Sequence, residues 1–114
     1  EDLKSWNGVK HLVLGNHDNA EFKSRGVSLK MLQEVFGENI HGFLRKYSWW
    51  LSHCPIHPDE LRGRMNVHGH IHGHLIDDPR YFNICMEHID YTPISLESIR
   101  KEFESRASLI AALK

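Results

Sequence analysis

Three short motifs rich in histidine follow one another along the chain in an order that could build a metal site. They are Gly15-Asn16-His17-Asp18, Ser52-His53-Cys54-Pro55 and Gly69-His70-Ile71-His72. Neutral imidazole nitrogens and an amide oxygen are ligands for Zn, Mn, Fe or Ni, whereas Mg and Ca prefer sites made of oxygen atoms alone. The motifs therefore point to a site for zinc or a transition metal.

The last motif places His70 and His72 one residue apart, between Gly69 and Gly73. On a regular strand the two imidazoles would share one face, and in a glycine-flanked loop they could lie beside two neighbouring ions. A pair of ions is the clamp of many phosphatases and nucleases, where it stabilises the attacking and leaving oxygens. With ten histidines in 114 residues, the tract alone could equally be a loop or an incidental metal binder. The upstream Gly-Asn-His-Asp motif favours the metal site.

The order and spacing of the motifs resemble the calcineurin-like metallophosphoesterase family. That family is recognised by five blocks: Asp-x-His, Gly-Asp, Gly-Asn-His-Asp/Glu, an isolated His, and Gly-His-x-His. This chain carries the last three. The residues around His53 and His70, and the tail from Phe82 to Leu96, further resemble a small bacterial and phage branch of predicted phosphoesterases. The resemblance extends from about Val9 to the helix expected after Pro93.

The resemblance implies a role for each motif residue. Asn16, His53 and His70 would bind the second metal, and His72 would bind the first. His17 would be the catalytic residue beside the phosphoryl oxygens, where it stabilises charge or protonates the leaving alkoxide as a general acid. The complete enzyme would hold two divalent ions, of Mn, Fe, Zn or Ni.

Two blocks of the family have no counterpart in this chain. Neither Asp-x-His nor Gly-Asp precedes Gly15, and neither occurs further along. In the family they provide an Asp and a His for the first metal and the Asp that bridges both ions, so only His72 would remain for the first metal. A single protein ligand holds an ion weakly. We expect a fragment of a longer enzyme; the alternatives are a half whose N-terminal partner is supplied in trans, and a truncated relative without activity.

The elements that must position these motifs fit an α/β fold. We expect one domain over residues 1–114, the C-terminal portion of an α/β/β/α sandwich of the metallophosphoesterase type. Short apolar or aromatic stretches predict strands at Val9–Leu14, Tyr47–Ser52, Met65–His68 and Tyr81–Glu87. Apolar residues at helical spacing predict helices at Ser28–Phe36, with Gly37 as its stop, and from Ser95 onward.

Several other residues could have a functional role or an ordinary structural one. Trp49 and Trp50 could stack on a substrate, but alternation along a strand favours packing in the core. Arg62 and Arg64 could hold a phosphate or lie at the surface. Cys54, beside a histidine, could be a nucleophile, but the sequence shows no third group to orient such a pair.

The composition predicts a soluble cytoplasmic domain. The net charge is −1 and the sequence pI about 6.9, and no basic cluster favours nucleic-acid binding. No apolar run approaches the ~20 residues that span a bilayer. Two cysteines in apolar contexts favour reduced thiols over a disulfide.

The function predicted from these observations is hydrolysis of phosphomonoesters or phosphodiesters by a metal-activated hydroxide. The alternatives are a noncatalytic metal-binding or interaction module and half of a split enzyme, so enzymatic activity stays open. The expected partners are a phosphoester substrate and either an N-terminal half or a second copy of the chain, because half a sandwich exposes an edge and a face of its sheet.

Overall fold

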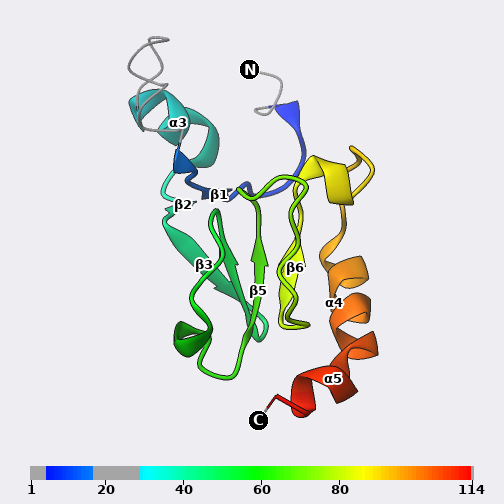
Figure 1. The fold of residues 1–114 in the computed structure, drawn as a ribbon. Coiled ribbons are helices and arrows are strands. Elements are labelled where there is room, and N and C mark those ends of the chain that lie inside the picture. Colours follow the sequence, from blue (N-terminus) through cyan, green and yellow to red (C-terminus); the bar gives the residue numbers. More distant parts are fainter. Residues whose placement is uncertain (1–4, 17–28, 114) are drawn as a thin grey trace.

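The described strands form two sheets of unequal size (Figure 1). The computed structural model describes residues 5–16 and 29–113. In the small sheet, β1 (Leu12–Val13) pairs in parallel with β2 (Ile40–His41). The larger sheet has the order β3-β4-β5-β6 and comprises β3 (Phe43–Lys46), β4 (Trp49–Ser52), β5 (Met65–His68) and β6 (Tyr81–Asn83).

In the larger sheet, β3 runs antiparallel to β4, and β4, β5 and β6 are mutually parallel. The register places Ser52 opposite His68, and His68 opposite Asn83. Because parallel strands end at the same edge of a sheet, the loops that follow β4 and β5 begin side by side. The Gly69 amide joins them by donating to the His53 carbonyl at 2.9 Å.

The helices begin and end at residues with clear local causes. Helix α3 (Leu29–Phe36) ends at Gly37, which has φ +61° and donates its amide to the Gln33 carbonyl at 2.7 Å. Helix α4 (Leu96–Ser105) begins after Ser95, whose hydroxyl accepts from the Ser98 amide at 3.1 Å. Helix α5 (Ala107–Ala111) follows directly. Two short 3-10 helices cover Pro58–Glu60 and Met86–His88.

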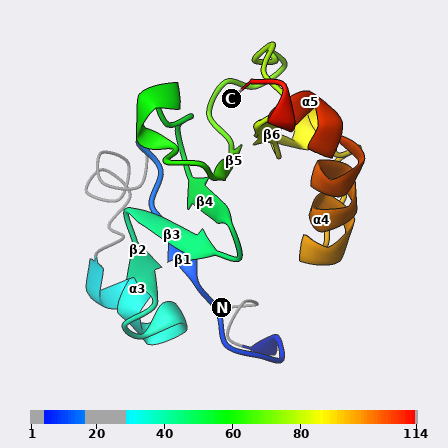
Figure 2. The ribbon, with the colours of Figure 1, turned by 90° about the horizontal axis from the view of Figure 1, so that it is seen from below.

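The main hydrophobic core lies between the larger sheet and α4, which runs beside it with α5 (Figure 2). It consists of Trp49, Val67, Ile99 and Phe103, with the Trp49 and Phe103 rings 5.5 Å apart. Fully burying side chains of this size contributes about 1.5–3 kcal/mol each. Trp50 faces away from this core, and its indole nitrogen donates to the Leu61 carbonyl at 3.1 Å. The preference for a packing role of Trp49 is confirmed.

The α/β class is confirmed, and β5 has the bounds that the sequence predicted. The strand expected over Val9–Leu14 is shorter, because only Leu12 and Val13 have a pairing partner. Ser28, the expected start of α3, lies outside the described residues. Strands β2 and β3 were not predicted. Their paired stretch, residues 40–46, carries little hydrophobic alternation.

Two predicted elements end earlier than expected. The strand predicted to reach Glu87 stops at Asn83, since the Asn83 side-chain oxygen accepts from the Cys85 amide at 2.8 Å and turns the chain. The C-terminal helix breaks at Arg106, whose guanidinium donates to the Tyr81 carbonyl at 2.8 Å. Within residues 5–16 and 29–113, no helix is long and apolar enough to cross a membrane.

Candidate metal centre

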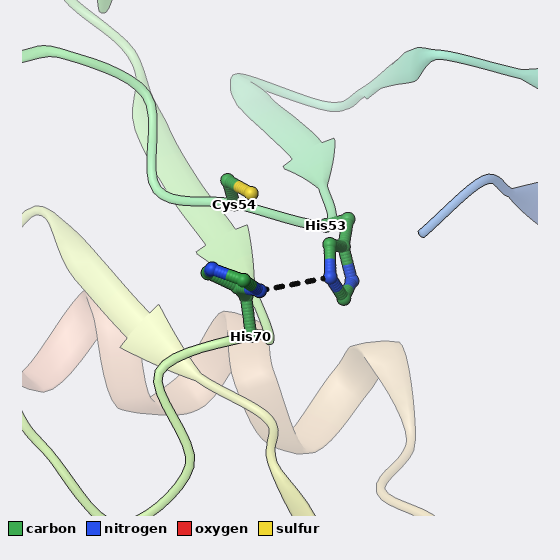
Figure 3. Close-up of side chains that lie close together, drawn as sticks. All are labelled: His53, Cys54 and His70. Atoms are coloured by element: carbon green, nitrogen blue, oxygen red, sulfur yellow. Dashed lines mark hydrogen bonds between the residues drawn. The ribbon is translucent and has the colours of Figure 1, made fainter. Parts of the chain in front are cut away.

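Three of the four residues predicted to bind metal lie together. Asn16 Oδ1 is 2.6 Å from His53 Nε2, and the same nitrogen is 3.1 Å from His70 Nδ1. Figure 3 shows His53 and His70 facing one another. Their ring centroids are 4.8 Å apart. The structure therefore brings together side chains separated by 37 and 17 residues in the sequence.

The three side chains come from both sheets. Asn16 follows β1 in the small sheet, while His53 follows β4 and His70 follows β5 in the larger sheet. The candidate metal centre, defined as Asn16, His53 and His70, thus lies where the ends of strands from two sheets meet. Asn16 and His70 are exposed, and His53 is half-buried.

Gly15 gives the His53 ring the space that it occupies. A Cβ at this position would lie 3.1 Å from His53 Nδ1 and 3.2 Å from its Cε1. Contacts this short force one of the two groups to move. The first glycine of the Gly-Asn-His-Asp motif therefore has a steric role, which is to let Asn16 approach the histidine.

His72, the fourth predicted ligand, lies away from the candidate metal centre. Its Nδ1 is 3.6 Å from a carboxylate oxygen of Glu87, and its side chain is 83% exposed. Both His70 and His72 have positive φ, at +71° and +51°. This left-handed backbone costs a non-glycine residue about 1 kcal/mol and turns the chain sharply. His70 consequently faces His53, and His72 faces Glu87.

A buried asparagine that the sequence reasoning missed holds the loop that carries His53. The Asn66 side chain is fully buried, with 0% exposure. Its amide nitrogen donates to the Trp50 carbonyl at 2.9 Å and to the Ser52 hydroxyl at 3.0 Å, and its oxygen accepts from the Ile56 amide at 2.8 Å. The backbone on both sides of His53 is therefore tied to strand β5.

A second buried asparagine does the same for the loop that carries His70. The Asn83 amide nitrogen donates to the carbonyls of His72 at 3.0 Å and His74 at 2.9 Å. Asn66 and Asn83 both stand in apolar strand sequences, Met-Asn-Val and Phe-Asn-Ile. An amide buried among such neighbours needs hydrogen-bond partners. That signal could have identified both positioning residues.

His68 is the buried last residue of β5, directly before the loop that carries His70. It is 1% exposed, and its Nδ1 donates to the Gly69 carbonyl at 2.9 Å. Burial lowers the pKa of His68, the Gly69 carbonyl opposes this shift, and the nearby His88 adds to it. Burial therefore favours the uncharged form of the side chain that ends β5.

The donor atoms of the candidate metal centre fit zinc or a first-row transition metal. Zinc binds histidine nitrogen at about 2.0–2.1 Å, so two nitrogens on a tetrahedral ion are about 3.3 Å apart; the observed pair is 3.1 Å apart. The 2.6 Å contact to Asn16 is a hydrogen bond, and because an amide oxygen only accepts, His53 Nε2 carries the hydrogen. A metal ion needs the lone pair of this nitrogen, so on binding the hydrogen has to leave Nε2, for example by a change of tautomer to Nδ1.

A pocket of about 410 Å³ adjoins the candidate metal centre and is lined by Asn16, His53 and Cys54 together with apolar side chains. Arg62 and Arg64 are not among its lining residues. Arg62 is 3.4 Å from Glu60, and Arg64 lies over the Trp50 ring at 5.5 Å. His17, the predicted catalytic residue, lies outside the described residues.

Comparisons of the chain with protein-family models, with curated proteins and with solved structures found no match in any of the three. A function for the chain therefore has to be inferred from its own motifs and from the geometry of Asn16, His53 and His70.

Proposed function

We propose that this chain is a metal-dependent phosphoesterase domain that acts on phosphomonoesters or phosphodiesters. The observation that supports this most is the meeting of Asn16, His53 and His70. The motif resemblance assigns these same residues to one ion. An incidental contact between two surface histidines would not explain why the side-chain oxygen of Asn16, in the Gly-Asn-His-Asp motif, lies 2.6 Å from His53 Nε2.

A bound divalent Mn, Fe, Zn or Ni ion would supply Lewis-acid activation of water and of a phosphoryl oxygen. The chain would hold it through Asn16 Oδ1, His53 Nε2 and His70 Nδ1. His17 follows Asn16 directly in the sequence and is our candidate general acid for the leaving alkoxide. The pocket of about 410 Å³ gives a phosphoester room to approach Asn16 and His53, which line it.

We further propose that the two sheets are the C-terminal portion of an α/β/β/α sandwich. The strands form two separate sheets, and the residues that follow them, Asn16 and His53, nevertheless come into contact; this supports the arrangement. An N-terminal half, or a second copy of the chain, would complete it and supply the remaining ligands of a second ion beside His72. The free thiols Cys54 and Cys85 suit a reducing, cytoplasmic compartment.

A noncatalytic metal-binding module is the second candidate function. The observation in its favour is His72, which lies beside Glu87 and not beside the other predicted ligands. In this alternative the chain binds one ion and catalyses no hydrolysis.

Metal uptake is the first test. The purified chain is titrated with Mn and Zn by calorimetry, beside His53→Ala and His70→Ala. His74→Ala is the matched control, because His74 is an exposed histidine of the same loop and hydrogen-bonds through its backbone amide and carbonyl. We expect binding that both ligand variants abolish and that the control retains. Equal binding by all four proteins would refute the candidate metal centre.

Hydrolysis separates the two candidate functions. The Mn-loaded chain is assayed with p-nitrophenyl phosphate and bis-p-nitrophenyl phosphate, beside His17→Ala and His74→Ala. Turnover that His17→Ala loses and His74→Ala keeps supports the phosphoesterase. Metal binding without turnover, including after an N-terminal half is added back, supports the noncatalytic module.

A further inference from the structure

Cys54 lies beside the candidate metal centre and has no role in the predicted ligand set. One ligand atom from each of His53, Cys54 and His70 lies within 4.8 Å of the others. Figure 3 shows Cys54 next to His53 on the same loop, with His70 opposite. Three protein ligands leave one position free on a tetrahedral ion. The Cys54 sulfur is a candidate for that position.

The geometry requires only a small movement of the thiol. With bonds of about 2.3 Å to sulfur and 2.0–2.1 Å to nitrogen, a tetrahedral ion places S and N about 3.6 Å apart. Because the ligand atoms of His53, Cys54 and His70 lie within 4.8 Å of one another, the distance to be closed is at most about 1.2 Å. Cys54 is exposed, so its side chain can rotate about the Cα–Cβ bond without displacing a packed neighbour.

The backbone that carries Cys54 is already fixed beside the candidate metal centre. The Ser52 hydroxyl donates to the Cys54 carbonyl at 2.6 Å and accepts from the buried Asn66 amide at 3.0 Å. The His53 carbonyl accepts from Gly69 at 2.9 Å, which joins this loop to the one that carries His70. The sulfur is thus held close to both histidines by contacts that do not involve the sulfur itself.

We propose that the Cys54 thiolate is the fourth ligand of the ion bound by Asn16, His53 and His70. On binding, the S–H proton passes to the solvent and a sulfur–metal bond forms. Thiolate is a soft ligand, so the site would prefer Zn and Co over Mn and Mg. A four-ligand site is closed to water, as in structural zinc sites. Cys54 would therefore hold the ion in a closed state, and its release would open the position that hydrolysis requires.

This inference rests on the metal binding in the proposed function. Cobalt spectroscopy can show separately whether the chain binds no metal and whether Cys54 is not a ligand. Co²⁺ is titrated under reducing conditions into the wild-type chain, Cys54→Ser and Cys85→Ser. The Cys85 variant is the matched control, because Cys85 is the other thiol of the chain and is half-buried beside Gly69. Circular dichroism checks that each variant is folded.

We expect the wild type and Cys85→Ser to show visible d–d bands of tetrahedral cobalt and a near-ultraviolet sulfur-to-cobalt charge-transfer band. Cys54→Ser should keep the d–d bands, lose the charge-transfer band and bind Zn at least about tenfold more weakly, with Mn affinity unchanged. Wild-type d–d bands without charge transfer, or a charge-transfer band that survives in Cys54→Ser, would overturn the role of Cys54 alone. The absence of all cobalt bands would overturn the metal binding of the proposed function and this inference with it.

Discussion

The two sheets contribute to the candidate metal centre in different ways. The larger sheet has a buried core with α4 and supplies both histidines, each on a loop tied to a buried asparagine. The small sheet has two residues in each strand, all half-buried, and supplies Asn16. The histidine side is therefore preformed by packing and hydrogen bonds, whereas the position of Asn16 depends on a weakly packed element.

This difference indicates where the free energy of metal binding would act. A ligand that binds only the folded state stabilises it. Because His53 and His70 are already held by the larger sheet, a bound ion would add most to the small sheet, through Asn16. A side-chain contact adds to the β1–β2 pairing, since the ring nitrogens of His11, just before β1, and His41, in β2, lie 3.0 Å apart.

Removing a core side chain of the larger sheet should have the largest effect on stability. Phe103 is 4% exposed and contacts the rings of Trp49 and Phe82. Phe103→Ala should lower the free energy of unfolding by about 3–5 kcal/mol. Leu12→Ala, in the half-buried β1, should cost about 1 kcal/mol, because the Leu12 side chain buries less apolar surface on folding than Phe103 does. Urea unfolding measures both, and equal losses would contradict the difference between the sheets.

Removing the buried carboxamide of Asn66 should have the next largest effect. Asn66→Ala leaves the Ile56 amide and the Trp50 carbonyl without this partner, which we expect to cost about 2–3 kcal/mol of unfolding free energy. Zinc affinity should also fall, because the His53 loop loses its tie to β5. Asn7→Ala is the control: Asn7 is exposed, and its loss should change stability by less than about 0.5 kcal/mol. If Asn66→Ala is as stable as the wild type and binds zinc equally well, Asn66 does not position the His53 loop.

The same contrast explains how far the sequence could be interpreted. Strand β5 and helix α4 were predictable, because their apolar periodicity is what packs in the core. The ends of β6 and α4 were not, since they depend on the Asn83 side chain and on the reach of Arg106 to a distant carbonyl. Local sequence does not contain those long-range partners.

The candidate metal centre was predictable in part for a similar reason. Motif order indicated Asn16, His53 and His70, and the structure brings these three together. The orientation of His72 was not predictable, because it follows from the positive φ of His70 and His72 on either side of Ile71. The role of Asn66 follows from its burial. The only sign of that burial in the sequence is the position of a polar residue between two apolar ones, Met65 and Val67.

The pH dependence of stability should distinguish buried from exposed histidines. The folded-state pKa of His68 lies below its ordinary value of 6.5, chiefly because of burial. The unfolded chain therefore takes up the proton first. The contribution of His68 is complete above about pH 6.5 and is lost as the pH falls from there toward the folded-state pKa, by up to about 1.4 kcal/mol per pH unit.

His68→Asn tests this dependence, because an asparagine amide can still donate to the Gly69 carbonyl but does not titrate. Urea unfolding with a chelator present should give a shallower loss of stability below pH 6.5 for the variant than for the wild type. His57→Asn, at an exposed position, should leave the slope unchanged. Identical slopes for wild type and His68→Asn would show that His68 is not the group responsible.

The smallest predicted effect concerns the contact between the two sheets. Gly15→Ala places a methyl group 3.1 Å from His53 Nδ1, so the ring or the β1 end has to move by a few tenths of an ångström. We expect zinc affinity to fall about tenfold, which is about 1.4 kcal/mol. The free energy of unfolding without metal should change by less than about 0.5 kcal/mol, because the weakly packed small sheet can shift away.

Gly42→Ala is the matched control, since Gly42 lines the same pocket and an added Cβ would meet no atom within 4 Å. It should bind zinc as the wild type does. If Gly15→Ala lowers stability by several kcal/mol, the small sheet is as rigid as the larger one, and the asymmetry between them is wrong. If it changes neither stability nor affinity, Asn16 does not share an ion with His53, because the two could then separate at no cost to binding.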